Sequence, residues 1–383
     1  MNEIQYIETA EALHTFCQTM KQADWVAMDT EFLREKTYYP KFCLLQIATL
    51  EWVVCIDPIA LEGQMDELFA IINDPSIIKV LHSCRQDVEI FYQLSGKLPK
   101  PVYDTQLAAP LLGYQENPGY AMLVSGFLNI NLSKTHTRTD WSQRPLSAEQ
   151  VQYAADDVIY LAKIYCMMQE QLKALGRDQW LNEDFAQLLN PELYDLPPEN
   201  AWLKIRGKNK LTGKQLAIVQ VLAEWREKAA KNGDKPKNWI VRDEHILDMA
   251  KLQPTNMSEL AKIRGINDGF LRRSGPKVCQ LIKEGQEKEG LKLKDKPNSA
   301  KKTQQQEAIL DILNAVVRLR AVENALNPII LATRKDLESL LMQEDDCALL
   351  TGWRYSMVGK ELQTVLAGEC TFKIEQDSLV LQA

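Results

Sequence analysis

Two carboxylic acids one residue apart, Asp29 and Glu31, interrupt an apolar stretch that reads "WVAMDTEF" over residues 25–32. Positions two apart in a strand face the same side, so their carboxylates should project together and repel each other. The simpler interpretation is an exposed acidic edge strand. Apolar residues on both alternating faces favour a central strand instead. Acids buried there need a cation between them.

Two further places offer matching side chains. Asp87 follows a strand-like run in "IIKVLHSCRQDVEIF" (77–91) and falls in the first turn of the next helix. One interpretation is that Asp87 only stabilises the helix, whose dipole favours a negative charge in the first turn. The other is that Asp87 binds a ligand, because strand ends that lead into helices are common ligand sites. In "YAADDVIYL" (153–161), Tyr153 and Asp157 are four residues apart and share a helix face. Asp156 points about 100° away, as a solvent-facing or locally bonded residue.

The elements that must position these residues alternate between strand and helix. Strand patterns cover residues 25–32, 42–49, 51–57 and 77–82, and helical patterns cover 61–74, 83–94 and 146–175. Ser147 opens the last of these helices with Gln150 three positions on, an approximate capping box. The pattern predicts a mixed sheet flanked by helices.

Beyond a Pro-rich stretch at 190–200 the chain turns helical, and a charged stretch at 291–306 is predicted to be a second linker. The two segments that these stretches delimit look like a diverged repeat. Each has a long amphipathic helix (214–230, 305–325), then a proline before a short apolar run, then a second helix (244–252, 335–341). Each repeat is predicted to end with a helix that begins near Gly275 or Gly359.

Composition bounds the class of protein. The 383 residues carry a net charge of −7, and the eight cysteines include no C-x-x-C pair. This length predicts two or three domains, and the cysteine pattern predicts free thiols in a reducing compartment rather than disulfides or a zinc site. The N-terminus does not read as a signal peptide and no apolar run is long enough to span a membrane, so we expect a cytoplasmic protein.

The set Asp29-x-Glu31, Asp87 and Tyr153-x-x-x-Asp157 resembles the tyrosine-containing branch of the DEDD exonuclease superfamily. Within that branch, "LHSCRQDVEIF" (81–91) and "WSQRPLSAEQVQYAADDVIYL" (141–161) resemble the bacterial ribonuclease D family. The helical repeats resemble its helicase-and-RNase-D C-terminal (HRDC) domains. The resemblance implies a ribonuclease H-like exonuclease domain over 1–195 and all-α bundles over 207–288 and 305–383, with a linker at 289–304 between them.

The same resemblance implies a reaction. It implies two-metal hydrolysis of RNA from the 3′ end, releasing nucleoside 5′-monophosphates in tRNA 3′ maturation and stable-RNA processing. Asp29 would contact both ions, Glu31 and Asp157 the first, and Asp87 the second. Tyr153 would orient the attacking water. Oxygen ligands without Cys or His suit Mg²⁺ or Mn²⁺ rather than zinc.

Several residues are candidates for RNA contact, each with a structural alternative. They are Gln46, His82, Arg138, Trp141 and Arg144 in the first domain and Lys204, Arg206, Lys208 and Lys210 beyond it. The last four belong to residues 202–242, where eleven Lys or Arg face three acids, a local charge of +8. Phosphate contact is one interpretation of this run and a solvated helix face is the other. Asp104 in "VYDTQL" is predicted to cap a helix.

Two other functions stay open on these observations. One is a DNA-directed 3′–5′ exonuclease of the same superfamily, because discrimination depends on contacts to the 2′-hydroxyl that no motif reveals. The other is a non-catalytic RNA-binding scaffold, which a missing carboxylate would indicate; all four acids and Tyr153 are present. We expect no obligate protein partner, a monomer being plausible. The second repeat, with its acidic "MQEDDC" (342–347), is expected to pack against the catalytic domain or shape a ring.

Overall fold

The computed structural model describes residues 3–132, 139–293, 302–376 and 378–382. Its contacts divide the chain into two units. The first comprises Met1–Glu31, Cys43–Leu189 and Ala300–Ala383, and the second comprises Phe32–Phe42 and Asn190–Ser299. Among the described helices, none combines the length and the apolar character needed to cross a membrane.

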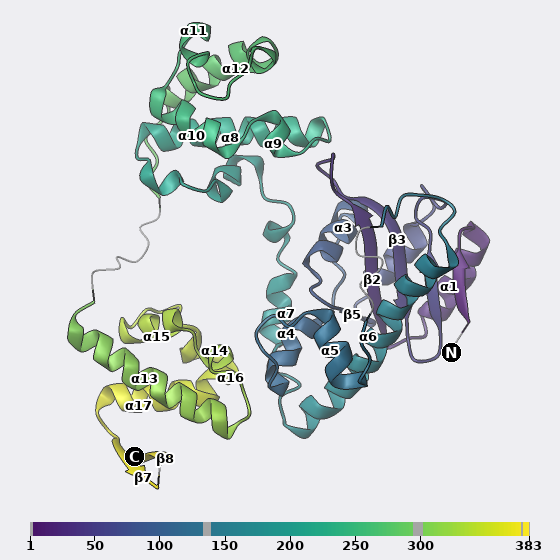
Figure 1. The fold of residues 1–383 in the computed structure, drawn as a ribbon, viewed down its shortest axis with the longest axis vertical. Helices are drawn as coiled ribbons and strands as arrows, with labels where there is room; N and C mark the ends of the chain where they lie inside the picture. Colours follow the sequence, from purple (N-terminus) through teal and green to yellow (C-terminus); the bar gives the residue numbers. More distant parts are fainter. Residues whose placement is uncertain (1–2, 133–138, 294–301, 377, 383) are drawn as a thin grey trace. The chain divides into compact units, whose positions relative to one another are not determined.

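A six-stranded sheet organises the first unit, with the strand order β1-β4-β3-β2-β5-β6 (Figure 1). The strands are β1 (Ile4–Ile7), β2 (Trp25–Leu33), β3 (Lys41–Ala48), β4 (Val53–Ile56), β5 (Ile78–Leu81) and β6 (Val102–Asp104). β3 and β4 are antiparallel, whereas β1 is parallel to β4 and β5 is parallel to both β2 and β6. The predicted mixed sheet is confirmed. Because β2 is an inner strand, its two acids do not lie on an exposed edge.

The four predicted strands correspond to β2, β3, β4 and β5. The prediction missed β1 and β6, which are four and three residues long and form the two edges of the sheet. The helix expected over 61–74 is shorter, covering only Asp66–Ile72 as α2. β3 is buried at every position from Phe42 onward and β4 throughout, so both faces of the sheet are covered.

Helices surround this sheet and include the long helix that the sequence predicts. They are α1 (Ala10–Met20), α2, α3 (Arg85–Ser95), α4 (Thr105–Ala108), α5 (Tyr120–Leu128), α6 (Ala148–Ala174) and α7 (Asn182–Leu188). The capping box at the start of α6 is confirmed, because Ser147 accepts from Gln150 N and the Gln150 side chain accepts from Ser147 N. α6 packs against β4 and β5.

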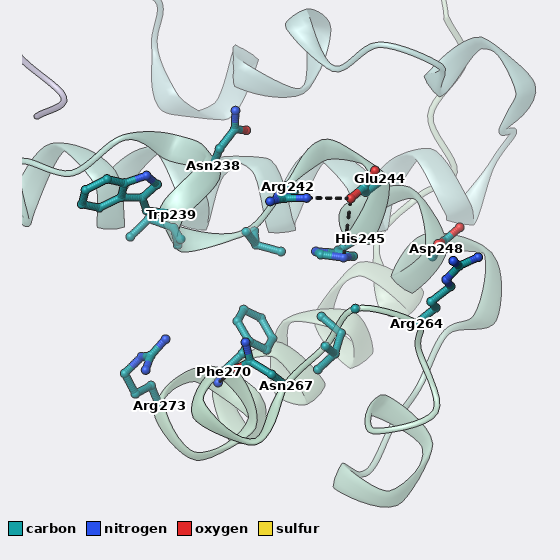
Figure 2. Close-up of a pocket in the computed structure, with 14 residues that line it drawn as sticks. Asn238, Trp239, Arg242, Glu244, His245, Asp248, Arg264, Asn267, Phe270 and Arg273 are labelled. Carbon is teal, nitrogen blue, oxygen red and sulfur yellow. Dashed lines mark hydrogen bonds and ion pairs between the residues drawn. The ribbon is translucent and has the colours of Figure 1, made fainter. Parts of the chain in front are cut away.

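Helices also build the second unit. They are α8 (Lys214–Asn232), α9 (Lys237–Ile240), α10 (Asp243–Leu252), α11 (Met257–Leu260) and α12 (Asp268–Glu287). The predicted start of the last helix near Gly275 is wrong: Asn267 caps α12 by accepting from Phe270 N, and Gly275 lies inside the helix. α9, α10, the loop after α11 and the start of α12 line a pocket of about 570 Å³ (Figure 2).

The C-terminal helices belong to the first unit. They are α13 (Gln304–Glu323), α14 (Pro328–Leu331), α15 (Arg334–Leu341), α16 (Gly352–Arg354) and α17 (Lys360–Ala367). They contact the region around α7: the Trp180 and Trp353 rings stack with centroids 4.7 Å apart, and an Arg177 guanidinium nitrogen donates to Asn324 O at 2.7 Å. These contacts agree with one of the two roles expected for the second repeat, packing against the N-terminal domain.

The chain ends in a hairpin that the sequence analysis did not predict. Strands β7 (Thr371–Glu375) and β8 (Ser378–Gln382) pair antiparallel. The alternation of Phe372 and Ile374 with polar residues is a strand signal that was present. β7 is exposed throughout, so it lacks the buried face that usually makes such alternation distinctive.

A buried ion pair fixes the segment that leads into α6. The Arg144 guanidinium donates to both carboxylate oxygens of Asp57, at 2.5 and 2.7 Å, and to the carbonyls of Cys43 and Trp141. Tyr6 donates to the same carboxylate at 2.8 Å. The Asp57 side chain is only 2% exposed. Arg144 therefore ties the entry to α6 to the sheet, and its expected contact with RNA is corrected to a structural role because its donors are taken up.

Replacing Arg144 tests this role. Arg144→Gln leaves the Asp57 carboxylate buried without its cation, so we expect the free energy of unfolding to fall by about 3 kcal/mol. The measurement is urea unfolding followed by circular dichroism. Arg318→Gln, which removes an exposed arginine of α13, is the control and should change little. Unchanged stability of Arg144→Gln together with weaker RNA binding would restore the original prediction.

Candidate active site

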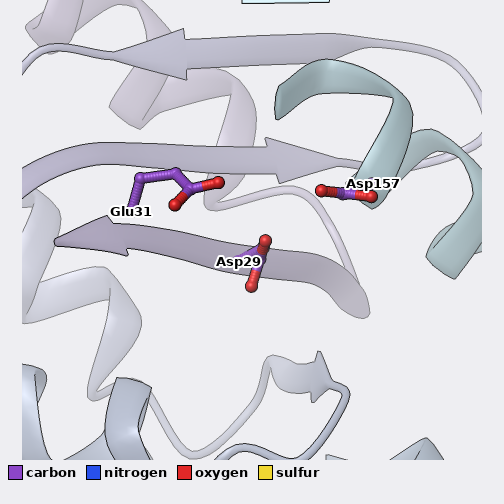
Figure 3. A group of neighbouring side chains, drawn as sticks. All are labelled: Asp29, Glu31 and Asp157. Carbon is purple, nitrogen blue, oxygen red and sulfur yellow. The ribbon is translucent and has the colours of Figure 1, made fainter. Parts of the chain in front are cut away.

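Three carboxylates from two elements meet at the centre of the first unit. Asp29 and Glu31 project from the same side of β2, and Asp157 faces them from α6 (Figure 3). Oxygen atoms of the three lie within 4.8 Å of one another. The alternation of the strand and the position of Asp157 on α6 therefore bring together the acids that the sequence analysis paired. Hard oxygen donors at this spacing fit a divalent cation such as Mg²⁺ or Mn²⁺.

The electrostatics of this cluster are unfavourable for three negative charges. Burial, followed by the charges of Asp29 and Asp157, raises the pKa of Glu31 to about 9. Burial and the charge of Asp157 also raise the pKa of Asp29, and burial together with Asp156 raises that of Asp157. Without a cation the cluster thus holds protons that free carboxyl groups would release at neutral pH.

The fourth predicted acid, Asp87, lies beside this group rather than in it. It is buried in the first turn of α3, and its Oδ1 accepts a hydrogen bond from Thr30 Oγ1 at 2.5 Å. Thr30 stands between Asp29 and Glu31 on β2. Burial and then the charge of Asp29 raise the pKa of Asp87, which indicates that the carboxylate is electrostatically linked to the cluster.

A turn between β5 and α3 determines where Asp87 stands. Ser83 in this turn has a φ of +59°, a left-handed conformation that is uncommon for residues other than glycine. Asp104, at the end of β6, accepts from the backbone N–H groups of Ser83 and Cys84 at 3.0 and 2.9 Å. Its side chain also caps α4 by accepting from Gln106 N, which confirms the predicted cap. The sequence analysis did not predict its bonds to the Ser83 and Cys84 N–H groups.

The tyrosine of the motif lies against the acids and packs on a tryptophan. The rings of Tyr153 and Trp141 stack with centroids 6.2 Å apart. Burial and then the charges of Asp157, Glu31 and Asp29 raise the pKa of Tyr153 to about 12, so its hydroxyl is protonated at neutral pH. A second tyrosine that the sequence analysis did not single out, Tyr120, donates its hydroxyl to the Asp157 carbonyl.

The residues predicted to contact RNA in this domain have mostly structural surroundings. Trp141 is 4% exposed, so the expectation of base stacking is corrected to support of Tyr153. Gln46 is fully buried, and within the described residues its amide nitrogen and oxygen have no hydrogen-bond partner. His82 contacts Thr105 Oγ1 through Nδ1 at 3.0 Å and packs on the Tyr120 ring. Arg138 lies outside the described residues.

Many cations of the basic run over 202–242 have bonding partners within the fold. Seven of its eleven cationic side chains bond to carboxylates or backbone carbonyls: Lys208, Lys214, Arg226, Lys228, Lys231, Lys237 and Arg242. Lys208, for example, donates to the carbonyl of Leu203 at 2.6 Å. Phosphate contact by Lys204, Arg206, Lys208 and Lys210 stays a prediction. Asp195, Asp243 and Glu244 lie outside the stretch and pair with three of its cations, so the charge count overestimated its free positive charge.

The raised carboxyl pKa values predict how metal and pH act on stability. The folded state binds more protons than the unfolded state between pH ~4 and pH 9, so the metal-free protein should lose stability as pH rises through this window. Thermal melts in chelator should therefore show a melting temperature that falls from pH 5 to pH 9 and recovers when Mg²⁺ is added.

Glu31→Gln should flatten that slope and raise the melting temperature of the metal-free protein at pH 8 by a few degrees, because one repelling charge is gone. The control, Glu35→Gln, changes an exposed acid just beyond β2 and should leave the slope as in the wild type. Equal slopes in wild type and Glu31→Gln, or no response to Mg²⁺, would contradict this prediction.

Comparison with known proteins agrees with this geometry. Residues 4–173 match the 3′-5′ exonuclease family model and residues 215–282 match the HRDC domain model. Ribonuclease D of Bartonella henselae is 34% identical over 364 residues, covering 94% of this chain and 89% of that protein. Ribonuclease D of Acidiphilium cryptum is 35% identical over 366 residues, covering 94% and 93%.

A solved structure shares the fold over nearly the whole chain. The crystal structure of Escherichia coli RNase D, described as an exoribonuclease involved in structured RNA processing, superposes with a TM-score of 0.80 at 30% identity. The match covers 96% of this chain and 99% of that one. The three acids on β2 and α6 lie in the part that matches the exonuclease model. The chain therefore belongs to the ribonuclease D family of 3′–5′ exoribonucleases.

Proposed function

We propose that this enzyme trims the 3′ ends of tRNA precursors and other stable RNAs and releases nucleoside 5′-monophosphates. The observation that carries the proposal is the group of Asp29, Glu31 and Asp157, whose oxygens lie within 4.8 Å of one another. Structured-RNA processing by the Escherichia coli relative supports the substrate class. The choice of tRNA precursors is the finer part of the proposal.

The family fold implies a divalent metal, and the carboxylate group fits one. We propose two ions, with Asp29, Glu31 and Asp157 as ligands of the first and Asp29 and Asp87 as ligands of the second. Such ions polarise the scissile phosphate and make bound water a stronger nucleophile.

Tyr153 would hold the attacking water by hydrogen bonding. Its raised pKa of about 12 favours this orienting role over that of a general base, because the phenol keeps its proton at neutral pH. Trp141 stacks on the ring and limits its movement. Position in such a site matters because a misplaced group loses most of its effect on the rate.

Two variants of neighbouring acids test the site. Asp157→Asn should lower kcat/KM on a 5′-labelled tRNA precursor with a short 3′ trailer by about 10²–10³-fold. Asp156→Asn is the matched control: it lies next to Asp157 on α6, but its carboxylate bonds to Gln152 at 2.8 Å. It should stay within a few-fold of the wild type. Equal losses in both variants would contradict the assignment.

The same assay separates the alternatives. Shortening from the 3′ end that needs Mg²⁺ or Mn²⁺ and is weak on a matched DNA oligonucleotide supports the proposal. Faster loss of the DNA would indicate a DNA-directed exonuclease, and binding of RNA without cleavage under both ions would indicate a scaffold. Either result would overturn the proposed substrate or chemistry.

Asp104 is proposed as a positioning residue for Asp87. Asp104→Asn places an amide against the N–H groups of Ser83 and Cys84, so the turn that carries Asp87 should shift. We expect a 10–100-fold lower kcat, a nearly unchanged KM and a higher half-saturating Mg²⁺ concentration. Asp74→Asn, which alters a similar turn-capping carboxylate bonded to Ser76 N, is the control. A lower melting temperature with unchanged Mg²⁺ dependence would show a merely structural role.

We also propose that residues 207–288 and 305–383 are two HRDC-like domains joined by a linker over 289–304. Both helical regions run from a long helix (α8, α13) through a four-residue helix beside a proline (α9, α14) to a second helix (α10, α15). A reducing cytoplasm is the proposed location, which suits the eight free cysteines.

A further inference from the structure

Two arginines of the second unit, Arg264 and Arg273, lie outside the basic run over 202–242. Arg264 follows α11 and Arg273 lies on α12; both are exposed, and within the described residues neither has a carboxylate within ion-pair distance. Both line the 570 Å³ pocket. Two exposed guanidinium groups that line one cavity and lack a carboxylate partner are available to bind an anion.

The opposite wall of the pocket carries an exposed aromatic ring. Trp239 on α9 is 59% exposed, the most exposed aromatic side chain among the large hydrophobic residues of the described chain. Figure 2 shows Trp239 and Arg273 at the same end of the pocket, with Arg264 at the other. An indole face open to solvent beside guanidinium groups is suited to stacking a nucleobase.

The acids in the pocket already have cations. Glu244 lies 3.6 Å from Arg242 and 3.8 Å from His245 Nε2, and Asp248 lies 3.6 Å from Lys251. Three arginines (Arg242, Arg264 and Arg273) line the pocket against these two acids, so the pocket keeps a net attraction for negative charge. A cationic partner such as a basic peptide is not favoured.

One wall of the pocket depends on a glycine in the loop after α11. Gly265 has a φ of +85°, and a Cβ at this position would lie 2.6 Å from His245 Nε2. Only glycine lets the loop after α11 approach α10 this closely. Phe270, 7% exposed, forms the apolar floor beneath the opening. The two walls are thus held at a fixed separation.

We propose that this pocket binds unpaired RNA substrate, with one base on Trp239, the phosphate beside that base at Arg273, and a neighbouring phosphate at Arg264 at the other end of the pocket. The volume falls within the 300–1,000 Å³ of small-ligand sites. This inference rests on the proposed RNA substrate. It places a sequence-tolerant contact with single-stranded RNA at residues 238–273 of the second unit, whereas the carboxylates that carry the chemistry belong to the first unit.

Binding by the full chain tests the site. Anisotropy of a 5′-labelled 12-nucleotide single-stranded RNA, measured in the Asp157→Asn background to prevent cleavage, should show at least a tenfold loss for Arg264→Ala/Arg273→Ala. Arg272→Ala removes an exposed arginine next to Arg273 that does not line the pocket, and should stay within twofold. Trp239→Ala should lose about fivefold or more, and Trp239→Phe should recover most of it.

Other outcomes would overturn the proposal. Unchanged affinity in the double variant and in Trp239→Ala would do so, as would an equal loss in Arg272→Ala, which would show general charge attraction. Adenosine 5′-monophosphate that binds as tightly as the RNA would indicate a free-nucleotide site. Displacement by an acidic peptide without any effect on RNA would indicate a protein partner.

A dinucleotide substrate separates this inference from the proposed function. In the catalytically intact background, Arg264→Ala/Arg273→Ala should hydrolyse a dinucleotide at the wild-type rate, because that substrate occupies only the carboxylate site. A rate lowered as much as RNA binding would overturn a separate pocket. Absence of hydrolysis in the wild type as well would instead count against the proposed function.

Discussion

Mutual repulsion among half-buried carboxylates is the constraint on which the first unit depends. Asp29 and Glu31 are forced together by the period of β2, and Asp157 is brought to them by α6. A cluster of this kind cannot hold itself together, because every member raises the free energy of ionising the others. Contacts elsewhere in the first unit must therefore offset the folding free energy that this repulsion costs.

The scaffold holds the acids through the turns and helix entries beside them. Arg144 ties the start of α6 to Asp57 near the sheet, and Tyr120 bonds to the carbonyl of Asp157 within the helix. On the other side, Asp104 holds the left-handed turn at Ser83 from which α3 begins. His82 joins these two supports, since it contacts both Thr105 and the Tyr120 ring. The residues that hold the site thus outnumber its acids.

Much of the fold and of the acid cluster could be predicted from sequence because their signals are local. The alternation in "WVAMDTEF" and the capping box at Ser147 depend on neighbours in the chain, and β2 and α6 were found where these patterns occur. The roles of Trp141, Arg144 and Lys208 could not be predicted in this way. Each depends on a partner that the tertiary fold supplies: the Tyr153 ring, the Asp57 carboxylate and the Leu203 carbonyl. Short strands such as β6 fail for a different reason, since three residues carry no period.

The bonded lysines of the second unit affect how strongly RNA binding depends on salt concentration. Each phosphate neutralised on single-stranded RNA contributes about 0.7 to the slope of log affinity against log salt concentration. Eleven available cations over residues 202–242 would give a slope near 8, by the same estimate. Seven of those cations already bond to carboxylates and carbonyls of the fold. Fewer cations are then free to neutralise phosphates, so RNA binding releases fewer counterions. The enzyme would then keep its grip on RNA over a wide range of salt, at the cost of weak attraction at long range.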